Sequence, residues 1–171
     1  MRDHTLRVRA GTTGDVDAAQ SLMGSARRWL HEQSIDQWQD RVPDSTFEKD
    51  AERGHFFVVE RHGAVIAMVT VADEDDETWP ADDVPASYVH RLAVDSSHRG
   101  DNLGGRLLSW VEVRAQEAGK QVVRLDCAAD NPGLRRFYEA RGFSHVGDSS
   151  VSDPTGARSL KISLYEKRLD A

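Results

Sequence analysis

The sequence predicts an α/β fold, a mixed central β-sheet of about seven strands flanked by about four helices. Segments with a strand pattern and segments with a helix pattern follow one another in the order β-α-α-β-β-β-α-β-α-β-β. No internal repeat, low-complexity stretch or linker separates them. The chain has 171 residues, of which 39% are hydrophobic, and this is enough for one compact core. We therefore expect a single domain over residues 1–171.

The bounds of the strands and helices are predicted from alternation, helix caps and turns. Strands are predicted at residues 6–9, 55–60, 64–71, 87–94, 121–127, 143–146 and 159–167. Helices are predicted at residues 16–30, 46–53, 102–118 and 132–140. The polar run Thr12 to Asp15 offers caps for the first helix, and Gly54 is suited to end the second. Residues 61–63 form a tight hairpin between two strands.

The C-terminal elements follow from the same signals. Residues 73–86 are acidic and contain Pro80 and Pro85, so we expect a loop. The third helix ends at Gly119, and its apolar face consists of Leu107, Leu108, Val111 and Ala115. Apolar and polar residues alternate from Ser159 to Lys167, which predicts a final strand.

Composition excludes several classes of protein. The net charge of −7 argues against general affinity for nucleic acid. No apolar run approaches the roughly 20 residues that span a bilayer, and none follows Met1-Arg2-Asp3-His4 as a signal core. We therefore expect a cytoplasmic protein with no membrane partner. Cys127, the only cysteine, lies on an apolar strand, which favours a buried reduced thiol over a nucleophile. No Cys/His cluster has zinc-ligand spacing, so no metal is expected.

Residues 90–106 carry the strongest functional signal. They read HRLAVDSSHRGDNLGGR, an apolar strand followed by a polar loop and a glycine-bearing helix start. Unpaired backbone N–H groups and the helix dipole at such a junction attract phosphate. Arg99 and Arg106 flank the loop with positive charge that suits bidentate phosphate contacts. The alternative is a tight turn whose glycines only relieve backbone strain.

A second segment, residues 121–143, sharpens this signal. A strand ends at Asp130-Asn131, a helix then carries Phe137 and Tyr138, and Gly142-Phe143 follows it. Together the two segments resemble the GCN5-related N-acetyltransferase (GNAT) superfamily. The family's later pattern is Asn-x-x-Ala-x-x-x-Tyr-x-x-x-Gly-Phe. It aligns with Asn131, Leu134, Tyr138, Gly142 and Phe143, with leucine in place of the alanine.

The family's acetyl-CoA loop reads Arg/Gln-x-x-Gly-x-Gly/Ala and aligns with residues 99–104, where Asn102 replaces the first glycine. Asparagine tolerates left-handed backbone geometry, so the loop remains possible. The resemblance implies parallel fourth and fifth strands that splay apart to admit the pantetheine arm of acetyl-CoA, the cosubstrate. The cofactor-binding residues that it implies are Leu92, Ala93, Val94, Arg99, Gly100, Asp101, Asn102, Leu103, Gly104, Gly105, Arg106, Asn131 and Tyr138. Asn131 is also suited to cap a helix.

Acetyl transfer to an amine requires a positioned and polarised thioester, a neutral amine and a stabilised leaving thiolate. Tyr138 matches the family's general acid, although a tyrosine on an amphipathic helix can also simply pack. His90 has the intrinsic pKa of a general base, although a lone histidine on a strand is often structural. Asp73, Glu74 and Glu32 are the other candidates for the base.

The expected acceptor is a small cationic or primary amine. The net charge, the acidic run 73–77 and the tryptophans of residues 28–40 support this expectation. The resemblance places the early helices over the acceptor pocket, where Trp38 can form a cation–π wall and where Asp73 and Glu74 can attract the amine. The alternatives are that the acidic run is a solvated face and that the indoles seal the helices onto the sheet.

We therefore expect an N-acetyltransferase that moves an acetyl group from acetyl-CoA to a primary amine of a small molecule or peptide, by direct attack in a ternary complex. The alternative is a catalytically silent acyl-CoA-binding regulatory module of the same fold, which has no need for the phenol of Tyr138. A nucleotide-binding protein is disfavoured because the loop lacks a P-loop Gly-Lys-Ser/Thr. Many members of the family pair through their C-terminal strands, so residues 160–165 predict a homodimer, unless the chain buries that face in its own core.

Overall fold

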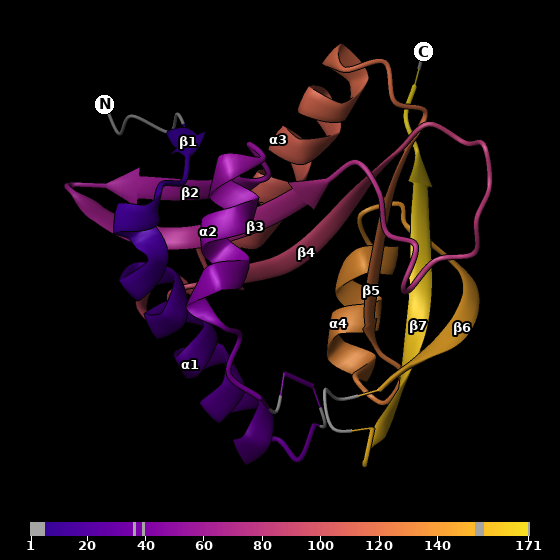
Figure 1. Cartoon of the computed structure of the whole chain (residues 1–171), viewed down its shortest axis with the longest axis horizontal. Helices are drawn as coiled ribbons and strands as arrows, with labels where there is room; N and C mark the ends of the chain where they lie inside the picture. Colours follow the sequence, from indigo (N-terminus) through magenta and orange to yellow (C-terminus); the bar gives the residue numbers. More distant parts are fainter. Residues whose placement is uncertain (1–5, 36, 39, 153–155, 171) are drawn as a thin grey trace.

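The computed structural model describes residues 6–35, 37–38, 40–152 and 156–170, and Figure 1 shows their arrangement. Within these residues seven strands form one sheet in the order β1-β2-β3-β4-β5-β7-β6. The strands are β1 (Val8–Ala10), β2 (Phe56–Arg61), β3 (Ala64–Ala72), β4 (Ala86–Val94), β5 (Val122–Ala128), β6 (Ser144–Ser152) and β7 (Ser159–Arg168). The α-helices are α1 (Val16–Glu32), α2 (Asp44–Glu52), α3 (Leu103–Glu117) and α4 (Pro132–Glu139). The predicted mixed sheet and helix order are confirmed.

β6 is the element that the sequence predicts least well. The apolar pattern stops at Val146, whereas the strand continues to Ser152 and pairs with β7 as far as Ser159. β6 is an edge strand of the described sheet, and most of its side chains are exposed, so few apolar residues are needed to hold it. Backbone pairing with β7 extends this strand where the sequence pattern carries no signal.

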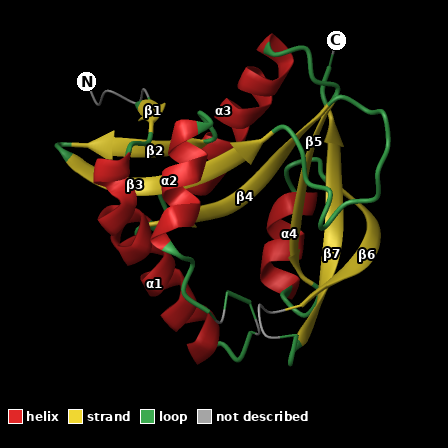
Figure 2. Cartoon of the chain, in the orientation of Figure 1, coloured by secondary structure: helices red, strands yellow, loops and turns green. Residues whose placement is uncertain are grey.

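Two layers of helices cover the sheet, one on each face (Figure 2). α1 and α2 pack their apolar residues against Phe56, Val58 and Met68 of the sheet. α3 and α4 pack on the other face, against Phe57 and Val69 among others. The alternation of side chains along β2 and β3 therefore supplies one core on each side.

β4 and β5 are parallel neighbours that pair only where they begin. The pairs are Ala86 with Val122, Ser87 with Val123 and Tyr88 with Arg124. Beyond Tyr88 the two strands diverge, and Figure 1 shows the resulting V between them. The splay that the family resemblance implies is therefore present, and among the described residues no strand pairs with the edge of β4 from Val89 to Val94 on that side.

A bulge interrupts β4 at the splay. Two residues of β4, Arg91 and Leu92, lie opposite the single residue Val69 of β3. Arg91 has φ of 49°, a left-handed backbone that is unusual for a residue with a side chain. Because the extra residue shifts the alternation, His90 and Ala93 both lie on the face covered by α1 and α2. Such bulges are over-represented next to active sites.

The loop between β3 and β4 is fastened to the sheet by Arg124. This buried guanidinium donates to both oxygens of Asp82, to Glu166 and to the hydroxyl of Tyr88. Its carbon also lies 4.8 Å from the ring centroid of Trp79. Trp79 in turn packs on apolar side chains of β7, namely Ile162 and Leu164. The loop between β3 and β4 therefore covers part of the β7 face through which we expected the homodimer to form.

No helix among the described residues is long and apolar enough to cross a membrane. Residues 1–4, on which the expectation about a signal peptide depends, lie outside the described part of the chain.

Candidate active site

The β4–α3 connection has the backbone that the motif predicts. Gly100 and Asn102 both have positive φ, 98° and 52°. Asn102 is the left-handed residue directly before α3, so its replacement of a motif glycine is compatible with this geometry. The first N–H groups of α3, from Leu103 onward, have no partner within the helix and can bind an anion.

Arg141 adds a positive charge to this connection that the sequence analysis did not assign. Its guanidinium donates to the side-chain oxygen of Asn102 and lies 4.6 Å from the ring centroid of Phe137. A Cβ on Gly105 would come within 1.8 Å of this guanidinium. Gly105 is therefore required for the close approach of Arg141, and the pair places a cation beside the predicted phosphate loop.

A groove of about 380 Å³, here called the donor groove, runs along the open edge of β4. Its lining residues are Ala26, Trp29, Leu30, Gln37, Trp38, Leu92, Ala93, Val94, Arg99, Asn131, Gly133, Leu134 and Phe137. Five of the residues predicted to bind the cofactor are among them. At one end the guanidinium of Arg99 stacks on Trp29, 4.9 Å from the ring centroid.

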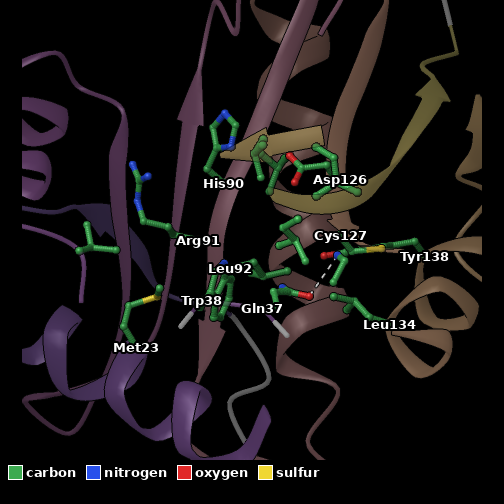
Figure 3. A pocket seen from close by; sticks show the side chains of 16 residues that line it. Met23, Gln37, Trp38, His90, Arg91, Leu92, Asp126, Cys127, Leu134 and Tyr138 are labelled. Atoms are coloured by element: carbon green, nitrogen blue, oxygen red, sulfur yellow. Dashed lines mark hydrogen bonds between the residues drawn. The ribbon is translucent and has the colours of Figure 1, made fainter. Parts of the chain in front are cut away.

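A second cavity, the central cavity of about 310 Å³, lies where β4 and β5 diverge. Figure 3 shows His90 and Asp126 at its upper end, and Gln37 and Trp38 toward its lower end. Tyr138 of α4 also lines it. His90 and Tyr138 are the two residues predicted to be catalytic. They are 48 positions apart in the chain, and both line the central cavity.

Tyr138 is 5% exposed and packs in an aromatic cluster. Its ring lies 5.5 Å from Phe137, 5.9 Å from Phe143 and 6.1 Å from Tyr165, measured between centroids. Burial raises the pKa of its phenol above the ordinary value of 10, so the hydroxyl remains protonated at neutral pH. The ring of Tyr138 therefore packs in the core, as the alternative to a catalytic role predicts. The residue also lines the central cavity.

His90 lies between acidic and basic neighbours. Its Nε2 is 3.3 Å from Oδ2 of Asp75. Burial lowers the pKa of His90, and the charge of Arg91 lowers it further, whereas Asp75 and Asp50 oppose this shift. Arg91 itself donates to the carboxylate of Asp50. The net result is an imidazole that is neutral at pH 7.

Two β5 residues complete the wall of the central cavity. Burial, helped by the charge of Asp75, raises the pKa of Asp126 to about 6. Burial raises the pKa of the Cys127 thiol to about 12. Cys127 is therefore a buried, protonated thiol, as the sequence predicted, and is unsuited to act as a nucleophile.

Gln37, from the connection between α1 and α2, reaches across the splay. Its side-chain oxygen accepts from the backbone N of Ala128 at 3.2 Å and from Nδ2 of Asn131 at 3.4 Å. Asn131 also caps α4, since its side-chain oxygen accepts from the backbone N of Leu134. The predicted capping role of Asn131 is confirmed, and its amide is held at the donor groove.

A third cavity, the acidic cavity of about 650 Å³, adjoins His90 on the α2 side. Its lining residues are Asp50, Arg53, His55, Thr70, Ala72, Asp73, Glu74, Asp75, Asp76, Glu77, His90 and Arg91. Asp73 is exposed and pairs with Lys120 at 2.9 Å, and this contact lowers its pKa, so a role as a general base is disfavoured. The side chain of Asp75 is buried, so the acidic run is not wholly a solvated face.

These features match one family of proteins. A model described as the acetyltransferase (GNAT) family matches residues 23–143 of this chain.

The chain belongs to the GNAT family.

Relatives of this GNAT protein span nearly its whole length. The uncharacterized N-acetyltransferase YesJ of Bacillus subtilis is 30% identical over 92% of this chain and 87% of its own. An S-alkylcysteine N-acetyltransferase of the same organism is 23% identical over 93% of this chain and 90% of its own. The structure of YncA from Salmonella typhimurium with acetyl-CoA has a TM-score of 0.70 and 20% identity, and the match covers 98% of this chain and 95% of that one.

The residues present in this GNAT protein fit an acyl-CoA. The edge of β4 from Val89 to Val94 is open to hydrogen-bond the amides of an extended ligand, as an added strand would. The donor groove follows this edge, and Arg99 lies at its end. Leu92, Ala93 and Val94 would hold the pantetheine arm, and the start of α3 would hold the pyrophosphate.

Sequence reasoning missed four residues of the site and proposed one that lies elsewhere. Gln37, Asp75, Asp126 and Arg141 were not singled out. Only Asp126 carried a usable signal, because a carboxylate in an apolar strand needs an explanation. Glu32, a candidate base, is exposed and lines a separate shallow cavity on α1.

Proposed function

We propose that this protein is an N-acetyltransferase that moves the acetyl group of acetyl-CoA to a primary amine of a small molecule or peptide, by direct attack in a ternary complex. One observation carries the proposal, which is that the three cavities are adjacent, because the central cavity shares lining residues with each of the other two. The donor groove and the central cavity share Gln37, Trp38, Leu92 and Leu134. The central and acidic cavities share His90 and Arg91. A thioester that enters from the donor groove and an amine that enters from the acidic cavity would meet in the central cavity.

His90 has the role of general base in this proposal. Its neutral imidazole accepts a proton from the ammonium form of the acceptor, and the freed lone pair attacks the thioester carbon. The new C–N bond forms, the C–S bond breaks, and the electron pair leaves with sulfur. The nitrogen then gives up its second proton, which balances the proton that sulfur receives, so the products are the amide, the CoA thiol and the proton held by His90. Tyr138, whose phenol remains protonated, donates a hydrogen bond or proton to that sulfur.

The acceptor class is supported by charge and by relatives. Asp73 and Glu74 lie on the acidic cavity, which favours a cationic amine, and Trp38 lines the path between donor and acceptor. One relative is named for acetylation of S-alkylcysteine, a small molecule that carries a primary amine.

A catalytically silent acyl-CoA-binding module is the alternative, and a thiol-release assay separates the two. Purified protein with acetyl-CoA is offered a panel of diamines, S-alkylcysteines, aminoalkylphosphonates, aminoglycosides and peptide N-termini. Thiol release with one amine, well above hydrolysis, supports the enzyme. Binding of CoA without amine-dependent release from any member of the panel supports the regulatory module.

Gly104→Asp is expected to weaken CoA binding by about a hundredfold. Its Cβ would meet only Phe137 at 3.7 Å and Val94 at 3.8 Å, which are ordinary contacts, so the variant should fold. A carboxylate about 5 Å from a phosphate charge costs roughly 3 kcal/mol at an effective dielectric constant near 20. Calorimetry with CoA measures the effect, and Gly104→Asn is the neutral control of equal size. Equal CoA affinities of the wild type and a folded Asp variant contradict the assignment of the loop.

Removing charge from the exposed part of the acidic run is expected to raise KM for the amine at low salt. The variant combines Glu74→Gln, Asp76→Asn and Glu77→Gln, and leaves the ion-paired Asp73 and the buried Asp75 in place. Steering by exposed charge is screened beyond about 8–10 Å at physiological salt, so the difference should disappear at high salt while kcat remains unchanged.

The control for this charge effect removes exposed carboxylates elsewhere, with Asp17→Asn, Glu117→Gln and Asp170→Asn. It has the same net charge as the loop variant. Steady-state kinetics at two salt concentrations compare the two. If both variants change KM equally, the acidic run has no specific role in attracting the acceptor.

We also propose a cytoplasmic location and a homodimer. β6 is an edge strand of the described sheet, and its outer edge is open to pair with a second copy. Light scattering at micromolar concentration should give twice the 19.1 kDa of one chain. A mass of 19.1 kDa contradicts the dimer.

A further inference from the structure

Three side chains converge on the boundary between the central and acidic cavities. Asp75 comes from the loop after β3, His90 from β4 and Asp126 from β5. One oxygen or nitrogen of each lies within 4.8 Å of the corresponding atoms of the other two. Asp126 lines the central cavity, Asp75 lines the acidic cavity, and His90 lines both. The cluster therefore lies where, in the proposed function, an acceptor from the acidic cavity would meet the thioester.

Asp75 holds a buried carboxylate oxygen beside His90. The side chain is 7% exposed, and its Oδ1 accepts from the backbone N of Thr78 at 3.1 Å. Its Oδ2 is buried, lies 3.3 Å from Nε2 of His90 and makes no hydrogen bond of good geometry with the described residues. The hydroxyl of Thr70, which is 2% exposed on the same cavity, is likewise unpartnered in the described structure. Buried polar atoms without partners are costly, so this region is built to receive a ligand with several donors.

We propose that Asp75, His90 and Asp126 form a cradle that binds the protonated primary amine of the acceptor. The proposal rests on the proposed acetyltransferase function and assigns two residues, Asp75 and Asp126, that the function did not yet use. A primary ammonium has three N–H donors, one for each of these side chains.

The charge of the cluster suits an ammonium nitrogen. Nε2 of His90 and Oδ2 of Asp75 are 3.3 Å apart, and one ligand atom from each of the three residues lies within 4.8 Å of the other two, so one small cationic group can contact all three side chains. The two carboxylates provide the negative charge that offsets the desolvation of the ammonium.

The cradle has a consequence for the choice of substrate. When one proton moves from the nitrogen to His90, two N–H groups remain, and the neutral amine must turn about its C–N bond so that its lone pair meets the thioester carbon. An N-methylated amine has only two N–H donors while it is protonated, so it leaves one buried acceptor unpaired. Discrimination between a primary amine and its N-methyl derivative is therefore a property of these two carboxylates.

Asp75→Asn and Asp126→Asn test the cradle. The probes are the best amine of the panel and its N-methyl derivative, and the measurements are kcat and KM for both. Each variant should raise KM for the primary amine about thirtyfold or more, the low end for loss of one partner of a buried charged pair. The preference for the primary over the N-methyl amine should fall in parallel. The amide introduced by Asp75→Asn retains an oxygen at the Oδ1 position, so the contact with Thr78 that shapes the loop is preserved.

Matched controls are Asp83→Asn in the same loop and Asp130→Asn after β5, both exposed carboxylates outside the three cavities. They should leave KM and the preference at wild-type values. Calorimetric titration of the amine into the CoA complex gives a second reading of the same affinity.

Three results overturn the proposal. Turnover of the primary amine with unchanged KM and unchanged preference in both variants refutes the cradle alone. Activity that is lost on chelation and restored by Zn²⁺ or Mn²⁺ assigns the cluster to a metal instead. No acetylation of any amine by the wild type refutes the acetyltransferase function, and the cradle with it.

Discussion

Tyr138→Phe is expected to lower kcat by about a hundredfold to ten-thousandfold, the range that general acid–base catalysis contributes. The phenol is the group on α4 that lines the central cavity and remains protonated at neutral pH. Phenylalanine keeps the ring, and with it the contacts to Phe137, Phe143 and Tyr165. Folding and acetyl-CoA binding should therefore be retained. Thiol release with the best amine measures kcat, and calorimetry measures donor affinity.

Tyr165→Phe is the matched control, because Tyr165 belongs to the same aromatic cluster but lies on β7. Its hydroxyl accepts from Arg135 and donates to Glu139, so its loss should reduce stability without changing turnover. Wild-type kcat in the Tyr138 variant means that the thiolate leaves without help from this residue. An equal loss of kcat in both variants means that the cluster acts only through packing.

Asp126→Asn is expected to raise the free energy of unfolding at pH 7 by up to about 3 kcal/mol. The pKa of Asp126 rises from 3.8 to about 6 in the folded protein because the side chain is buried beside Asp75. The folded state binds this proton more tightly than the unfolded chain does. Its contribution to stability is therefore complete below pH 3.8 and is lost as the pH rises through about 6. That loss corresponds to about 3 kcal/mol, and a neutral amide avoids it.

Urea unfolding of the wild type and the variant at several pH values measures this effect. The gap between them should be small near pH 4 and widen up to about pH 7. Asp130→Asn, an exposed carboxylate near the end of the same strand, should show no such gap. A variant that is less stable than the wild type at pH 7 contradicts the prediction. Higher stability together with weaker amine binding is the trade-off expected of a functional carboxylate.

The backbone of the β4–α3 loop and the cap of α4 were predictable because local sequence determines them. An anion site at a helix N-terminus needs only a strand, a tight loop and the first turn of a helix, all of which lie within residues 90–106. Asn102 takes the left-handed conformation that this loop requires, as its chemistry allows. Asn131 caps α4 from the position that the motif indicates. In each case the partners are a few positions apart in the chain, so the pattern contains them.

The acceptor side was not predictable in the same way. Gln37 reaches Ala128 across 91 positions of the chain, and no local pattern connects them. Asp75 is one of several adjacent acidic residues, and only its fold distinguishes it from its exposed neighbours Glu74 and Asp76. The loop that contains it is fastened to the sheet by Arg124, whose partner Asp82 is 42 positions away.

The sequence by itself determined the order of elements, the helix caps and the left-handed residue before α3, because periodicity, caps and left-handed turns are properties of neighbouring residues. The tertiary structure alone decided where β4 and β5 separate and that His90 faces Asp126 across the gap. The tertiary structure also decided which carboxylates are buried away from water. The reason is physical, since burial and the distance between remote side chains set the pKa values and the hydrogen bonds of the site, and both depend on the packing of the whole chain.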